Sequence, residues 1–131
     1  MDKMNYAPIK GKFRPLNFSI NVMFDAADKF GSMSKAFSII DKENREGAEA
    51  ICWFLVQMAN DAELVRRQEG QDHGDMLSDS DVVIDNPAIY RVYKSAVLKA
   101  IEIGYTCEIE NDNEVDLGLQ ELNQKKEKAG A

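Results

Sequence analysis

The sequence predicts a mainly α-helical protein, a small bundle of about four helices preceded by a short extended arm or β-hairpin. Four segments carry apolar residues at the i, i+3, i+4, i+7 spacing of one helix face. In addition, 44% of the 131 residues are apolar, which suffices for one modest core. We expect an arm over residues 1–16, a helical domain over 17–105 and a flexible acidic tail over 106–131.

Residues 1–16 contain two prolines and a glycine, which favour an irregular arm with one short strand or hairpin around residues 10–12. The first helix follows, and Asn17 or Ser19 can cap it by accepting a hydrogen bond from an N–H of the first turn. Gly31 ends this helix, since glycine tolerates the left-handed conformation that follows many helices. The apolar stripe consists of Ile20, Met23, Phe24 and Ala27.

The second helix is short and begins after Ser32 or Ser34. The third is the longest and covers about residues 44–68. Its apolar surface extends around most of the helix because of Trp53, Phe54 and Val56. This is typical of a central helix or of one that also offers a face to a partner. The stripe of the second helix is Met33, Ala36, Phe37 and Ile40. The stripe of the third is Ala48, Ile51, Cys52, Leu55, Met58, Ala59 and Ala62.

A linker rich in Gly, Asp and Ser spans residues 70–86 and leads to the fourth helix. This last helix has the clearest signals, because Asp85 or Asn86 can cap it and Pro87 takes the first helical position, where its missing N–H costs nothing. We expect Gly104 to end it. Five apolar residues tether the linker to the body: Met76, Leu77, Val82, Val83 and Ile84.

The charge and the cysteine content limit the classes of partner. The formal net charge of −7 repels phosphate, so nucleic acid is a poor partner despite a small basic cluster near the start. No apolar run approaches the roughly 20 residues that span a bilayer, and no signal peptide is visible. Only two cysteines are present, Cys52 and Cys107. We therefore expect a cytoplasmic protein that does not bind membranes.

The sequence shows no enzyme active site, and we predict no catalytic residue, cofactor or metal. The single histidine, His73, lies in a loop of glycines and aspartates, which is typical of a solvated turn. The acidic residues from Asp72 onward do not form a calcium loop, because the sixth position is Leu77 and the twelfth is Val83. Phosphate-binding glycine loops are absent from the sequence.

Two stretches carry a resemblance to a known family. Residues 12–19 run into a helix that ends at 28–32 with the sequence Asp-Lys-Phe-Gly-Ser. This resembles the opening of tail assembly chaperones of long-tailed bacteriophages and prophages, in which a short extended arm leads into a helix closed by a Tyr/Phe-Gly turn. Residues 53–67 are similar to the central helix of that family. The resemblance covers roughly residues 6–105 and leaves out the acidic tail.

The resemblance implies a helical protein of the bacterial host cytoplasm that keeps the tape measure protein soluble while tail tube subunits assemble around it. It implies no catalytic residue. We expect a hydrophobic helical segment to bind in a groove beside the third helix. The alternatives are a small helical interaction or regulatory subunit of another partner, and a homo-oligomer that covers the same surface. The candidate partner-binding residues are Trp53, Phe54, Met58, Arg66 and Arg67.

Overall fold

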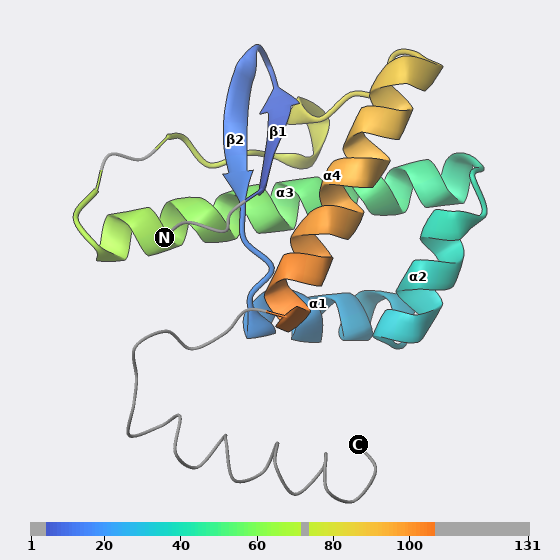
Figure 1. Ribbon diagram of the computed structural model, residues 1–131, viewed down its shortest axis with the longest axis horizontal. Helices are drawn as coiled ribbons and strands as arrows, with labels where there is room; N and C mark the ends of the chain where they lie inside the picture. Colours follow the sequence, from blue (N-terminus) through green and yellow to red (C-terminus); the bar gives the residue numbers. More distant parts are fainter. Residues whose placement is uncertain (1–4, 72–73, 107–131) are drawn as a thin grey trace, which may run out of the picture.

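The computed structural model describes residues 5–71 and 74–106, and it confirms the predicted fold class. These residues form a two-stranded antiparallel hairpin followed by four α-helices (Figure 1). In the part of the chain that is described, no helix combines the length and the apolar character needed to cross a membrane. The predicted acidic tail lies outside the described residues, apart from Thr106, which ends the last helix.

The N-terminal hairpin consists of β1 (Asn5–Ile9) and β2 (Lys12–Leu16). Lys10 and Gly11 join the strands with φ angles of 55° and 79°. Two central residues with positive φ are typical of the type I′ turn, whose twist matches that of paired strands. The hairpin is part of the core, because it packs on α3 and α4 and has four buried apolar side chains: Ala7, Ile9, Pro15 and Leu16.

The helices α1 (Ile20–Phe30) and α2 (Met33–Asp41) form a pair. The side chains of Ser19 and Ser32 cap them, since each accepts a hydrogen bond from a backbone N–H three residues later. Gly31 lies between the two helices with a φ of 100°, a conformation that few other residues adopt. The predicted start and end of α1 are therefore confirmed.

The apolar stripe predicted for α1 faces the core only in part: Met23 packs on the core and Ala27 is partly buried. Val22 and Ala26 are buried, whereas Ile20 and Phe24 are 57% and 55% exposed. Apolar residues occur on two sides of this short helix, so their spacing is compatible with burial of either side. The small side chain of Ala26 allows α1 to approach its neighbours, and the bulky pair is left outside.

The helix α3 (Arg45–Gln68) is central and contacts β2, α1, α2 and α4. Asn44 caps it by accepting a hydrogen bond from the N–H of Gly47 at 2.9 Å. A Cβ at Gly47 would lie 2.7 Å from the carbonyl oxygen of Ile39, so glycine allows α2 and α3 to approach closely. The buried apolar side chains of α3 are Ala50, Ile51, Phe54, Leu55, Val56, Met58, Ala59 and Ala62.

The helix α4 (Pro87–Thr106) crosses α3 (Figure 1). Asn86 caps it as predicted, because its Oδ1 accepts a hydrogen bond from the N–H of Ile89 at 2.9 Å. Gly104 does not end the helix, which continues to Thr106. A Cβ at Gly104 would lie 2.6 Å from the carbonyl oxygen of Phe18. This glycine is therefore required by a close contact rather than by a helix stop.

We expect Gly104→Ala to destabilise the protein by about 1–3 kcal/mol, although alanine favours helix. The added methyl group would overlap the backbone and ring of Phe18, which lies at the start of the chain's helical part. Urea denaturation measures the change, with Ser95→Ala as an exposed control in the same helix. A stability at or above that of the unmodified chain would show that the contact relaxes at little cost.

The linker between α3 and α4 includes a short 3-10 helix, η1 (Asp79–Asp81). Of the five predicted tethers, Val82 is buried, and Leu77 and Ile84 pack on the core. Met76 and Val83 are exposed, so the prediction is wrong for these two.

Candidate functional site

The first half of α3 borders a groove of about 700 Å³, which we call the α3 groove. The floor comes from the apolar residues Ala48, Ala50, Cys52 and Trp53 of α3. On one side lie Lys29 and Phe30 at the end of α1 together with Ile39 of α2. Residues from the segment 79–84 form the other side. The groove is thus built by three parts of the chain that are distant in sequence.

An aromatic cluster sets the position of Trp53 on this floor. The Trp53 ring meets Phe30 and Phe54 edge-on, with centroid distances of 5.4 and 5.0 Å. Phe30 and Phe54 stack on each other at 5.7 Å. Phe54 is fully buried, whereas Trp53 is only partly buried and lines the groove. The cluster therefore holds the indole in one orientation while part of it stays accessible to a partner.

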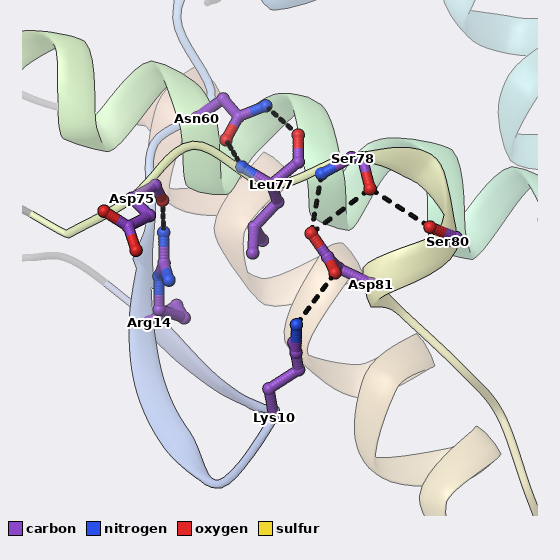
Figure 2. Close-up of polar contacts among 8 residues, drawn as sticks. All are labelled: Lys10, Arg14, Asn60, Asp75, Leu77, Ser78, Ser80 and Asp81. Atoms are coloured by element: carbon purple, nitrogen blue, oxygen red, sulfur yellow. Dashed lines mark hydrogen bonds and ion pairs between the residues drawn. The ribbon is translucent and has the colours of Figure 1, made fainter.

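Polar contacts fix the segment that forms the second side of the groove (Figure 2). The Asn60 amide donates to the Leu77 carbonyl oxygen at 3.0 Å and accepts from the Leu77 N–H at 2.7 Å. Further along, Lys10 Nζ lies 3.0 Å from Asp81 Oδ1, and the Ser78 N–H donates to Asp81 Oδ2 at 2.8 Å. The segment is thus fastened to α3 by one residue and to the hairpin turn by another.

The Asp81 carboxylate has a perturbed titration. The hydrogen bond from the Ser78 N–H lowers the pKa of Asp81, and the hydrogen bond from Lys10 lowers it further. A carboxyl whose pKa is lowered in the folded state adds stability above its unfolded pKa and loses it as the pH falls through the folded value. The contact between the groove wall and the hairpin therefore persists at neutral pH and weakens only in acid.

The rim of the α3 groove carries charges of both signs. Lys29 Nζ lies 5.7 Å from the Phe30 ring centroid and 5.9 Å from that of Trp53, within the range of a cation–π contact. An apolar floor with a mixed rim suits an amphipathic partner better than a uniformly charged one. The other charged residues of the lining are Arg45, Glu46, Glu49 and Asp79.

Cys52 also lines the groove. Burial raises the pKa of the Cys52 thiol, and the nearby Glu49 carboxylate raises it further. The thiolate is the nucleophilic form of cysteine, so this residue is protonated and unreactive at neutral pH. Cys52 therefore contributes a small apolar surface to the groove rather than chemistry.

The five predicted partner-binding residues do not form one surface. Trp53 lies in the α3 groove. Phe54 and Met58 are fully buried, and their side chains have no exposed area with which to contact a partner. An α3 that is apolar almost all round predicts a surface there, but this helix is surrounded by β2, α1, α2 and α4. Phe30 of α1, for example, stacks on Phe54. Arg66 and Arg67 lie in the last turn of α3, beyond the groove.

Both arginines in the last turn of α3 are engaged within the protein. Arg66 lies 3.6 Å from Glu63 Oε1, and Arg67 donates to the carbonyl oxygen of Gly74 at 3.4 Å. Arg66 is partly buried and Arg67 is exposed. Their contacts stabilise the end of α3 and the residues that follow it.

Glu63 is the buried polar residue that the sequence analysis missed. Its side chain is 1% exposed and lies 3.6 Å from the Nε of Arg14, which is itself nearly buried. The Gly74 N–H donates to Glu63 Oε1 at 2.6 Å, and Arg14 donates to the Asp75 carbonyl oxygen. One signal was available, because Glu63 follows Ala59 by four residues and so lies on the buried side of α3. This cluster joins β2, α3 and the linker.

No metal site accompanies these residues. Within residues 5–71 and 74–106, no group of three or more His, Cys, Asp or Glu side chains is placed to hold a metal ion. The solvated turn predicted at His73 lies outside the described residues.

Comparisons of the chain with protein-family models, with curated proteins and with solved structures find no match.

Proposed function

We propose that this chain is a tail assembly chaperone of a phage or prophage, and that it binds a hydrophobic helical segment of a tape measure protein in the α3 groove. The observation that carries the proposal is a groove of about 700 Å³ with a partly exposed tryptophan on its floor. The sequence resemblance supplies the class of client, and the groove supplies a place for it. The proposal includes no catalysis and no cofactor.

The size of the α3 groove suits helix-in-groove recognition, in which side chains one turn apart anchor an amphipathic helix. A helix with its side chains is about 10–12 Å wide, so only a few anchoring side chains of the client would enter about 700 Å³. Trp53 is positioned to contact them. A client recognised through a few apolar anchors needs no single fixed sequence, which suits a long helical protein with many similar segments.

The charged rim adds a second requirement. The groove is lined by two positively charged residues, Lys29 and Arg45. It is also lined by three negatively charged residues, Glu46, Glu49 and Asp79. Charges at the edge of an interface mainly affect the rate of encounter and the choice of partner. The proposed client segment therefore has an apolar stripe flanked by charged residues of both signs.

We expect Trp53→Ala to raise the Kd for the client segment about 30-fold, because an aromatic anchor at an interface contributes about 2 kcal/mol or more. Isothermal titration calorimetry with the isolated segment measures this change. The variant also loses contacts within the aromatic cluster, so its fold must be checked by circular dichroism. An unchanged Kd in a folded variant would show that the client does not contact Trp53.

A matched pair of variants separates binding from stability. Ala48→Arg places a long cation in the groove, whereas Leu64→Arg places the same side chain on an exposed part of α3 outside the groove. We expect the first to abolish binding and the second to leave it intact.

The decisive experiment is co-expression with the full-length tape measure protein of the same genome. We expect the client to become soluble with the unmodified chain and with Leu64→Arg, and to remain insoluble with Ala48→Arg. If the client is equally insoluble with and without the unmodified chain, and no complex is recovered, the chaperone proposal is wrong. Adding tail tube protein to the recovered complex then tests whether it is a further partner.

A second function is an interaction or regulatory subunit of another protein. The mixed charges of the rim support it as well, because they also suit an amphipathic segment of another partner. Gene neighbourhood distinguishes the two proposals. A tail tube gene upstream and a very long tape measure gene downstream would support the chaperone.

A further inference from the structure

A second groove, of about 620 Å³, lies between the hairpin and the first half of α4. It exposes three large side chains: Tyr6 at 43%, Phe13 at 75% and Val92 at 45%. We call it the hairpin groove. Aromatic and branched side chains gathered around one groove are typical of a surface that binds a partner.

The walls of the hairpin groove are held together by two hydrogen bonds. The Asn5 amide donates to the carbonyl oxygen of Ala96 at 2.9 Å, and the Tyr93 hydroxyl donates to the carbonyl oxygen of Pro8 at 2.6 Å. Both bonds join β1 to α4. The groove is therefore preformed, and an occupant would not need to order it.

The charge of the hairpin groove is opposite to that of the chain. Arg91 and Lys99 line it, and the lining contains no carboxylate. Neither cation forms an ion pair with a carboxylate among the residues that the structure describes, although Lys94 of the same helix pairs with Glu43. In a protein with a net charge of −7, this is an uncompensated cationic and apolar surface.

The sequence contains a segment of complementary chemistry, residues 108–122. It has six carboxylates and no basic residue. Apolar residues are interspersed among the acids. They are Ile109, Val115, Leu117, Leu119 and Leu122.

The segment also starts close enough to reach the hairpin groove. It begins two residues after Thr106, where α4 ends. Arg91 is fifteen residues before that end, a distance of about 22 Å along the helix. An extended segment of this length spans about 50 Å. We propose that residues 108–122 bind in the hairpin groove of the same chain, with carboxylates near Arg91 and Lys99 and apolar side chains on Phe13 and Val92.

The exposed face of α1 is a poorer site for this segment. Ile20 and Phe24 would offer apolar area there, but Asp25 and Asp28 are exposed on the same helix and repel an acidic segment. The hairpin groove has the apolar area without that repulsion. The inference does not depend on the proposed function, because it concerns a different surface and a different occupant.

Paramagnetic relaxation in the full-length chain tests the proposal. In a Cys52→Ser, Cys107→Ser background, Leu119→Cys carries a nitroxide label. We expect the label to broaden the amide signals of residues 91–99 and 6–13. The broadening should disappear at about 1 M NaCl, where the Debye length falls to about 3 Å. Signals that are unaffected by the label at low salt would overturn the proposal.

Charge variants identify the contacts. The double variant Arg91→Glu with Lys99→Glu should remove the broadening. Replacing the five acids between residues 108 and 116 by their amides should remove it too, and this change leaves the sequence of residues 5–106 as it is. The matched control is Lys35→Glu on α2 with Lys42→Glu directly after that helix. It changes the net charge by the same amount as the Arg91 and Lys99 changes and should leave the broadening intact. Broadening that survives both of the first two changes would overturn the proposal.

A mixture of two differently labelled samples distinguishes binding within one chain from binding to a second copy. A spin-labelled chain without ¹⁵N is mixed with an unlabelled ¹⁵N chain. We expect no broadening in this mixture. Broadening in the mixture equal to that in the singly labelled sample would show that the segment binds a second molecule, which overturns the same-chain proposal.

Discussion

Phe54→Ala is expected to lower the free energy of unfolding by about 3–5 kcal/mol, as for a large aromatic side chain removed from a core. Phe54 is fully buried and packs against both Phe30 and Trp53, so its loss leaves a cavity below the floor of the α3 groove. Urea denaturation followed by circular dichroism measures the change. Trp53 fluorescence reports independently whether the indole becomes mobile.

The same substitution at Phe24 is the control for Phe54→Ala. Phe24 is more than half exposed on α1, so its replacement should cost less than about 1 kcal/mol. Equal losses for the two variants would contradict the assignment of Phe54 to the core and of Phe24 to the surface.

Glu63→Ala is expected to destabilise the protein by about 3–5 kcal/mol, because removing one member of a buried ion pair leaves the other charge uncompensated. The Arg14 side chain is only 11% exposed, and the Gly74 N–H would lose its acceptor at Glu63. Thermal and urea denaturation measure the loss. Glu46→Ala is the control, since the pair between Glu46 and Lys42 is exposed and contributes little.

A double variant tests the cause of the effect at Glu63. Arg14→Met with Glu63→Met removes both charges and leaves apolar side chains of similar length in their place. If the penalty comes from an unpaired charge, this double variant is more stable than Glu63→Ala. A double variant that is at least as unstable would show that the polar contacts themselves hold the linker on α3.

The elements of this fold could be predicted because their signals are local. The cap at Asn86, the glycine at Gly31 and the apolar spacing of α3 lie within a few residues of the features that they determine. The buried face of α1 could not be predicted in this way. Val22 and Ala26 face the core because of how α1 packs on other helices, and periodicity does not record that contact.

The candidate site was predicted only in part for the same reason. The excess apolar residues of α3 indicated a groove beside it and identified Trp53. They did not indicate the opposite wall, because its path depends on bonds between distant residues, such as Asn60 with Leu77 and Lys10 with Asp81. The local sequence predicts that Gly104 stops the helix. Its contact with Phe18 could not be predicted, because Phe18 lies 86 positions earlier in the chain.

The pair formed by Lys10 and Asp81 has a consequence for the order of events during synthesis. The two residues are 71 positions apart, so the α3 groove lacks one wall until the chain has been made as far as the linker. Contacts between such distant residues form late in folding, because a long loop must close first. A nascent chain that has released only its hairpin and first helices therefore has no complete α3 groove. Under the proposed function, a client segment would bind only after the linker has been made and the second wall has formed.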